Sequence, residues 1–183
     1  MSKQDPSVPN GDAPHWTLEI ESVDADTTRS LAERLAGHLA PGDVILLSGE
    51  LGAGKTTFTQ GLGTGLGVRE GVISPTFVLA RIHPSLGEGP DLVHVDAYRL
   101  GSAEELDDID LESTLGTSVT VVEWGHGKAE HLAESRLEIH LARATGRDAG
   151  DELVFDFDET DDADPRLLRI QGFGPRWERN PLT

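Results

Sequence analysis

Cysteine is absent from this chain of 183 residues, which excludes disulfides, zinc ribbons and cysteine nucleophiles. No apolar run reaches the roughly eighteen residues that cross a membrane, so we expect no membrane-spanning segment. The first residues, MSKQDPSVPNGDAPHW, lack the apolar core of a secretory signal peptide. We therefore expect a cytoplasmic protein, and its length favours a single domain.

Basic residues are also scarce. Lysine and arginine total 15 against 33 aspartates and glutamates, which gives a net charge of −18. Because nucleic-acid binding draws its affinity from basic side chains that neutralise phosphates, we expect no direct binding of nucleic acid. The acidic residues gather in two runs, 104–112 and 148–164. Such runs usually form a solvated face or a flexible tail, and docking onto a basic partner is the alternative.

One glycine-rich segment matches a known phosphate-binding pattern in full. Residues 49–56, GELGAGKT, fit G-x-x-x-x-G-K-[ST] and lie between an apolar strand and a helix, as the pattern requires. The glycines let successive N–H groups face an anion at the positive end of a helix. Lys55 is expected to reach the β- and γ-phosphates, and the Thr56 hydroxyl to ligate Mg²⁺. A glycine-rich turn that matches by chance is the alternative, which the flanking strand and helix disfavour.

The hydrophobic pattern around this P-loop predicts an α/β fold. Residues 44–47 and 119–122 are continuous apolar runs, typical of strands buried on both faces of a parallel sheet. We expect a three-layer fold of the P-loop NTPase type, with a mixed, mainly parallel central sheet and antiparallel late strands. Those late strands are predicted at 137–141 and 153–157, where apolar and polar residues alternate. Further strands are expected at 16–20, 78–82 and 91–98, the last two as an antiparallel pair, and helices at 26–39 (capped by Asp26), at 56–62 and after Ser102.

A P-loop requires a second carboxylate near the metal, normally at the end of a buried strand, and the sequence offers two candidates. Glu123 ends the run 119–122, with glutamate where aspartate is commoner. Asp96 is the other candidate, because His94, Asp96 and Tyr98 would share one face of a strand. A structural hydrogen bond is the alternative role for Asp96. Thr76 lies where nucleotide switches carry a threonine that senses the γ-phosphate, although an ordinary turn would look the same.

The absence of two motifs bears on which base the nucleotide carries. Switch-type GTPases read guanine with Asn-Lys-x-Asp, and the only asparagines here are Asn10 and Asn180, neither followed by lysine. The Leu-Ser-Gly-Gly signature of transporter ATPases is absent as well. We therefore expect ATP as the nucleotide.

The order of four motifs, GELGAGKTT, SPTF, HVDAYRL and VVEW, resembles the TsaE family over about residues 18–147. Members are small bacterial P-loop ATPases required to form threonylcarbamoyladenosine at position 37 of certain tRNAs. The resemblance implies ATP and Mg²⁺ as cofactors and the TsaB and TsaD proteins as partners. It implies that tRNA is engaged only through that complex, with no membrane involved.

The same resemblance implies roles for individual residues. Thr56 and Glu123 would coordinate Mg²⁺, and Asp96 would lie near the γ-phosphate or a water on the metal. Thr76 would belong to a switch-like loop, Trp124 would flank the site, and Arg147 would contact the nucleotide. The catalytic residues would be Lys55, Asp96 and Glu123, and the nucleotide-binding residues Gly52, Ala53, Gly54, Lys55, Thr56, Thr57, Thr76 and Arg147.

The expected organisation is a disordered arm at 1–14, a P-loop ATPase domain at 15–158 and an acidic, partly disordered tail at 159–183. Two other functions remain open on the sequence. A small-molecule kinase would use the same P-loop, but its lid usually needs several arginines, whereas Arg69, Arg81 and Arg99 are scattered. The third interpretation is a nucleotide-dependent binding module with negligible turnover.

Overall fold

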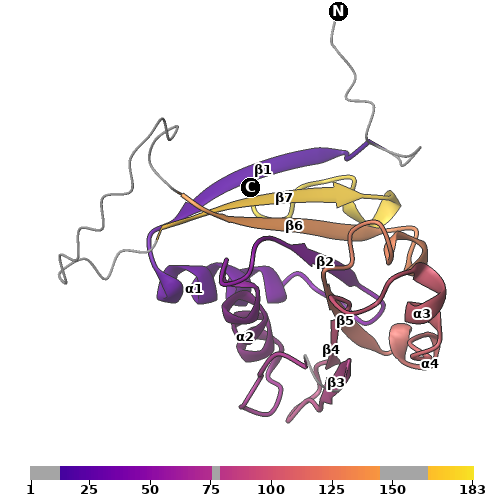
Figure 1. The fold of residues 1–183 in the computed structure, drawn as a ribbon. Helices are drawn as coiled ribbons and strands as arrows, with labels where there is room; N and C mark the ends of the chain where they lie inside the picture. The colour runs from indigo at the N-terminus through magenta and orange to yellow at the C-terminus, as the bar shows by residue number, and fades with distance from the viewer. Residues whose placement is uncertain (1–12, 76–78, 145–164) are drawn as a thin grey trace, which may run out of the picture.

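The computed structural model describes residues 13–75, 79–144 and 165–183. They form one seven-stranded mixed sheet in the order β1-β7-β6-β2-β5-β4-β3 (Figure 1). The strands are β1 (Trp16–Ser22), β2 (Val44–Ser48), β3 (Ala80–His83), β4 (Asp91–Asp96), β5 (Ser118–Glu123), β6 (Arg136–Arg143) and β7 (Arg166–Phe173). The helices are α1 (Ala25–Ala36), α2 (Lys55–Leu66), α3 (Ala103–Asp107) and α4 (Glu112–Leu115), with 3₁₀ turns η1 (Glu130–Leu132) and η2 (Pro175–Trp177).

The centre of the sheet is parallel, as the apolar runs predicted. Strand β2 pairs in parallel with β5 on one side and with β6 on the other, and β5 pairs in parallel with β4. Along β2, Ile45 and Leu47 belong to the core beneath α1 and α2. Val44 and Leu46 belong to a second core with Leu106 of α3 on the opposite face. The three-layer α/β fold is therefore confirmed.

Helix α2 lies close against α1, and two glycines of α2 permit that approach. A Cβ atom on Gly61 would collide with the carbonyl oxygen of Arg29, and one on Gly65 would lie 2.5 Å from the Cβ of Ala36. The close packing fixes the axis of α2, and with it the loop that precedes this helix.

The C-terminal segment differs from the expectation. Residues 159–183 were expected to form a partly disordered tail, yet they contain β7, which pairs antiparallel with both β1 and β6. Leu168 and Ile170 are fully buried and alternate with the exposed Arg169. The hydrophobic effect of burying that alternating face outweighs the acidic character of the preceding run. The expected strand at 153–157 and most of the expected arm at 1–14 lie outside the described residues.

The start of α1 also differs from the expectation. Asp24, rather than Asp26, caps this helix, because its extended backbone lets its Oδ1 accept a hydrogen bond from the Thr27 amide at 2.7 Å. Asp26 lies within the first turn and pairs with Arg29 instead. The cap at Ser102 is as expected, since its hydroxyl accepts from the Glu105 amide.

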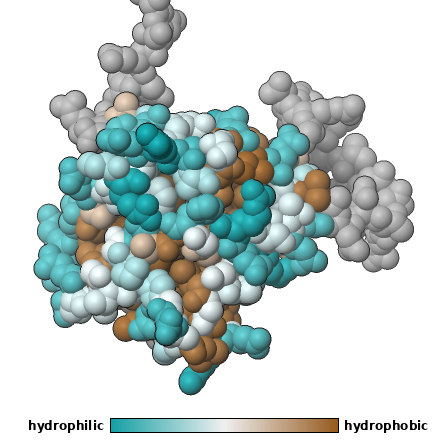
Figure 2. Space-filling model, turned by 180° about the vertical axis from the view of Figure 1, so that it is seen from behind, coloured by the Kyte–Doolittle hydropathy of each residue, from teal (hydrophilic) through white to brown (hydrophobic). Residues whose placement is uncertain are grey.

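The surface carries scattered apolar residues. Seen from behind, hydrophobic residues form separate patches among hydrophilic ones (Figure 2). Within the described ranges, no helix has the length and apolarity needed to cross a membrane. The large hydrophobic side chains with the greatest exposure are Val23, Leu51, Ile73, Ile82, Leu86 and Tyr98.

Candidate functional site

A glycine-rich loop, residues 49–54, connects the end of β2 to the start of α2. Gly49, Gly52 and Gly54 adopt φ values of 143°, 78° and 103°, in the region that favours glycine. A Cβ atom on Gly49 would collide with the carbonyl oxygen of Leu141 in β6. The loop therefore curls tightly against the sheet and ends at the N-terminus of α2, where unpaired N–H groups gather.

A pocket of about 500 Å³ opens over the start of α2. The loop forms one wall, and the carboxyl ends of β4 and β5 form the other, together with Ser74, Tyr98 and Trp124. Ala53 is buried behind the loop and does not line the pocket. Thr76 and Arg147 lie outside the described residues. The pocket brings together seven of the expected site residues: Gly52, Gly54, Lys55, Thr56, Thr57, Asp96 and Glu123.

Lys55 is held inside this pocket by the loop itself. Its Nζ donates to the carbonyl oxygens of Gly49 at 2.8 Å and Glu50 at 3.0 Å. Burial lowers the pKa of Lys55, while the carboxylates of Glu123 and Asp96 act to raise it. The side chain therefore places a buried cation beside two carboxylates and the loop.

The two carboxylates lie side by side because β4 and β5 are parallel and in register. Asp96 is the register partner of Glu123, and both are nearly buried, at 5% and 3% exposure. Asp96 accepts a hydrogen bond from the Tyr98 amide through Oδ1 at 3.0 Å, and its Oδ2 lies 3.5 Å from the Ser74 hydroxyl. The predicted carboxylate pair thus faces the same space as Lys55.

The chain turns sharply immediately after Glu123. Trp124 has a φ of 60°, and its amide donates to the carbonyl oxygen of Leu47 at 2.9 Å. A non-glycine residue in this region costs of order 1–3 kcal/mol, and such strain concentrates at functional sites. The Trp124 ring lies 5.1 Å from the ring of Tyr98, which is 63% exposed. These two aromatic rings form the outer rim of the pocket.

The sequence analysis did not identify Arg166 as part of the site. This arginine begins β7, is 8% exposed, and donates through Nε to the carbonyl oxygen of Ala53 at 3.0 Å. Its Nη2 lies 3.3 Å from the carbonyl oxygen of Gly52. Alternation along 167–171 could have indicated the strand, but no local pattern connects Arg166 with a loop more than a hundred residues earlier.

His94 was expected to share one face of a strand with Asp96 and Tyr98. It lies on β4 two residues before Asp96 and is fully buried, and its Nε2 lies 2.8 Å from Oε1 of Glu123. Tyr98 follows the end of β4 and reaches the pocket rim. Of this predicted group, Asp96 and Tyr98 line the pocket. His94 does not line it and instead contacts Glu123.

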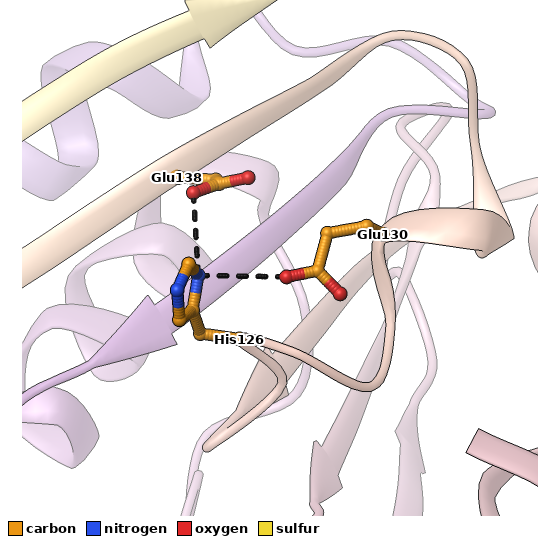
Figure 3. A group of neighbouring side chains, drawn as sticks. All are labelled: His126, Glu130 and Glu138. Carbon is orange, nitrogen blue, oxygen red and sulfur yellow. Dashed lines mark ion pairs between the residues drawn. The ribbon is translucent and has the colours of Figure 1, made fainter. Parts of the chain in front are cut away.

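A second group of titratable side chains lies outside the pocket. His126, Glu130 and Glu138 come from the loop after β5, from η1 and from β6, and converge on the histidine ring (Figure 3). The Nδ1 atom of His126 lies 3.4 Å from Glu130 and 3.6 Å from Glu138. Arg136 donates to Glu138 at 2.8 Å. These contacts connect the loop to β6, which is a structural role.

The side chains around the pocket suit a hard divalent cation. A threonine hydroxyl at Thr56 and two carboxylates at Asp96 and Glu123 offer only oxygen donors, which are the ligands that Mg²⁺ prefers. The loop and the N-terminus of α2 offer backbone N–H groups suited to an anion. The groups around the pocket are thus of the kinds that could hold a phosphate and a divalent cation.

A family model, curated proteins and a solved structure all match this chain. The family model described as threonylcarbamoyl adenosine biosynthesis protein TsaE matches residues 22–149. The tRNA threonylcarbamoyladenosine biosynthesis protein TsaE of Streptomyces coelicolor is 55% identical over 150 residues, 81% of this chain and 93% of that protein. Its Bacillus subtilis counterpart is 41% identical over 128 residues, 69% and 78% of the two chains. The crystal structure of Bacillus subtilis YdiB matches with a TM-score of 0.63 and 34% identity, covering 89% of this chain and 90% of that one.

Proposed function

Because this chain belongs to the TsaE family, and so to tRNA threonylcarbamoyladenosine biosynthesis, we propose that it is the Mg²⁺-dependent ATPase of that pathway. The modification would be formed at position 37 of tRNA. The observation that carries the proposal is the pocket, in which the glycine-rich loop, Lys55 and two carboxylates face one space.

The loop is suited to bind the phosphates of ATP. Backbone N–H groups at the start of α2 would hold the phosphate oxygens, helped by the positive end of the helix dipole. Lys55 donates to two loop carbonyls, and it would exchange them for the β- and γ-phosphates. An ammonium that is already desolvated gains more from such a contact than one in water.

The oxygen donors described above would hold Mg²⁺. Thr56 and Glu123 are the proposed ligands, and Asp96, which lines the same pocket, would contact a water on the metal or the γ-phosphate. Bound Mg²⁺ would neutralise phosphate charge as the γ-phosphate leaves. Glu123 or Asp96 would orient or deprotonate the attacking water, and Lys55, Asp96 and Glu123 are the proposed catalytic residues.

Turnover is expected to depend on partners. An arginine that stabilises the transition state contributes about 10³ to 10⁵ in rate where one is used. Arg166 is already engaged with loop carbonyls on the buried side. The isolated chain should therefore hydrolyse ATP well below the roughly 10 s⁻¹ of a median enzyme. TsaB and TsaD are the proposed partners in the cytoplasm, and with a net charge of −18 the chain would engage tRNA only through their complex.

The test is phosphate release from ATP by the purified chain, with and without TsaB and TsaD. Lys55→Ala should abolish hydrolysis while circular dichroism shows the parental fold. Hydrolysis by Lys55→Ala at the parental rate would overturn the assignment of the loop. Transfer of phosphate to a metabolite, in place of release, would favour a small-molecule kinase.

A further inference from the structure

A buried hydrogen-bonded pair lies beneath the floor of the pocket. His94 of β4 is fully buried, and its Nε2 lies 2.8 Å from Oε1 of Glu123 at the end of β5. The two side chains are 0% and 4% exposed. Among the described residues, Nδ1 of His94 has no hydrogen-bond partner. The carboxylate is thus the polar contact of this histidine.

The direction of the hydrogen bond follows from the chemistry of the two groups. A carboxylate that binds a metal is ionised and can only accept hydrogen bonds, so with Glu123 as a metal ligand Nε2 of His94 would carry the hydrogen and donate it. A glutamate side chain has three rotatable bonds, and fixing one of its oxygens removes most of that freedom. Glu123 therefore lines the pocket while its Oε1 atom is hydrogen-bonded to His94.

The sheet register explains why these two residues meet. His94 and Asp96 project from the same face of β4, two residues apart. Asp96 is the register partner of Glu123, whereas Val121 is the partner of His94. The Glu123 side chain therefore contacts the histidine diagonally across the two parallel strands. His94 lies two residues before Asp96, the register partner of Glu123. The contact depends on parallel pairing and is not a feature of either strand alone.

We propose that His94 is a positioning residue, which holds the Glu123 carboxylate in the orientation that binds Mg²⁺ together with the nucleotide. The proposal rests on the proposed function, in which Glu123 is a metal ligand. Hydrogen-bond partners of ligating side chains fix ligand orientation, and their loss typically costs 10–100-fold in metal affinity or activity. His94 would act in this way without touching metal or nucleotide.

The chain offers a matched control in His83. This residue of β3 is 6% exposed, and its ring centroid lies 6.4 Å from that of His94. Its Nε2 also has no partner among the described residues, and it does not hydrogen-bond Glu123. Replacing His83 removes a buried imidazole from the same region without removing the contact with the carboxylate.

The experiment measures binding rather than turnover. The probe is adenylyl imidodiphosphate, an ATP analogue resistant to hydrolysis, titrated over a series of Mg²⁺ concentrations and in EDTA. His94→Leu should raise the half-saturating Mg²⁺ concentration by about 10–100-fold and leave binding in EDTA unchanged. His83→Leu should match the parent. Melting temperatures show whether each variant is folded.

Two amide substitutions of His94 provide a second test if His94→Leu does not fold. His94→Gln places a donor near the position of Nε2, whereas the amide of His94→Asn is too short to reach Oε1. The glutamine variant should retain the parental Mg²⁺ requirement, and the asparagine variant should show the shift. In a Glu123→Gln background, replacing His94 should add nothing further.

Three results would overturn the role of His94. They are a parental Mg²⁺ titration in His94→Leu and His94→Asn, an equal shift in His83→Leu, and an added shift in the Glu123→Gln background. A parent whose affinity does not respond to Mg²⁺ at all would instead contradict the proposed function, and the positioning role with it. The parental titration therefore separates the two failures.

Discussion

The Nζ atom of Lys55 lies 4.4 Å from the centroid of the Trp124 ring. The ammonium at the start of α2 is thus placed over the aromatic residue that follows β5, while it also donates to two loop carbonyls. A cation over an indole gains about 0.5–2 kcal/mol, depending on how far it is desolvated. The sharp turn at Trp124 is what brings its ring under the lysine.

This contact should make Trp124 a reporter of the proposed nucleotide binding. If Lys55 moves to the phosphates, its ammonium leaves the ring, and the intrinsic fluorescence of Trp124 should change as ATP is added. Trp124→Phe should abolish the change, as should Lys55→Met. Trp16 and Trp177 pack with β7 and η2, away from the pocket. A change of parental size in Trp124→Phe would contradict the expectation.

The proposed Mg²⁺ ligands can be separated from their neighbours. Thr56→Val removes a hydroxyl ligand, and Glu123→Gln keeps the shape of the side chain but removes its charge. Each should raise the Mg²⁺ concentration required for hydrolysis by at least about tenfold, with little effect on ATP binding in EDTA. Thr57→Val is the control for the Mg²⁺ requirement alone, because Thr57 is an expected nucleotide-binding residue that lines the same pocket without a proposed metal contact. An unchanged titration for Glu123→Gln would transfer the ligand role to Asp96.

Arg166 should contribute more to stability than its neighbour on the same strand. Arg166→Met leaves the buried carbonyl of Ala53 and the partly buried carbonyl of Gly52 without this charged donor, which should cost about 1–3 kcal/mol in urea unfolding. Arg169→Met removes only an exposed pair with Glu19, at 52% and 49% exposure, worth about 0–1 kcal/mol. Arg166→Met should also weaken ATP binding, since it supports the loop. Equal losses of stability in the two variants would contradict this.

Acid should destabilise the chain partly through His83. Burial, with His94 and Arg81 nearby, lowers the pKa of His83 below its usual value of 6.5. As the pH falls below 6.5, the unfolded chain therefore takes up a proton that the folded chain does not, and the folded state loses stability. His83→Leu removes this loss, so its melting temperature should fall less than that of the parent between pH 7.5 and 5. An equal fall in melting temperature for the parent and His83→Leu over that pH range would exclude the effect.

The acidic run in and around α3 should help to bind partners. Its acids are exposed and follow β4 after a short loop. We expect ATP-dependent association with TsaB and TsaD that weakens with added salt, because exposed charges are screened beyond about 10 Å at 0.1 M. A pull-down at several salt concentrations would compare the parent with amide variants. The tested acids are Glu104, Glu105, Asp107 and Asp108, and the control acids on β1 and α1 are Glu19, Glu21, Asp26 and Glu33. Equal binding by the parent and both variants would show that the acidic run is a solvated face and does not bind partners.

Features encoded over a few consecutive residues were predictable. The loop at 49–54, the strand before it and the helix after it follow from one contiguous pattern. Glu123 was found because it ends a recognisable strand, and Asp96 because it would share one face of a strand with His94 and Tyr98. Parallel pairing in register then brings the two carboxylates together. The choice of Asp24 over Asp26 as the cap was not predictable, since both lie near the helix start and the extended backbone at Asp24 decides it.

Contacts set by sheet order were not predictable. The contact of Arg166 with Ala53 joins residues 113 positions apart, and that of His94 with Glu123 joins residues 29 apart. Neither spacing carries a signal, because strand order and register decide which side chains meet. Strand β7 itself follows a long acidic run, whose composition resembles a tail more than the approach to a sheet.

The position of β7 between β1 and β6 makes the order of synthesis matter. The Trp16 indole donates to the carbonyl oxygen of Trp177, 161 positions later, and only a glycine at 172 leaves room for that ring. On the ribosome, β1 emerges early and has no strand to pair with until β7 appears, whereas β2, α2 and β5 can already associate. Arg166 reaches the back of the glycine-rich loop in the same late step. The glycine-rich loop therefore gains its full support only when the far end of the chain has been made, so that nascent, shortened chains would lack this support for the pocket.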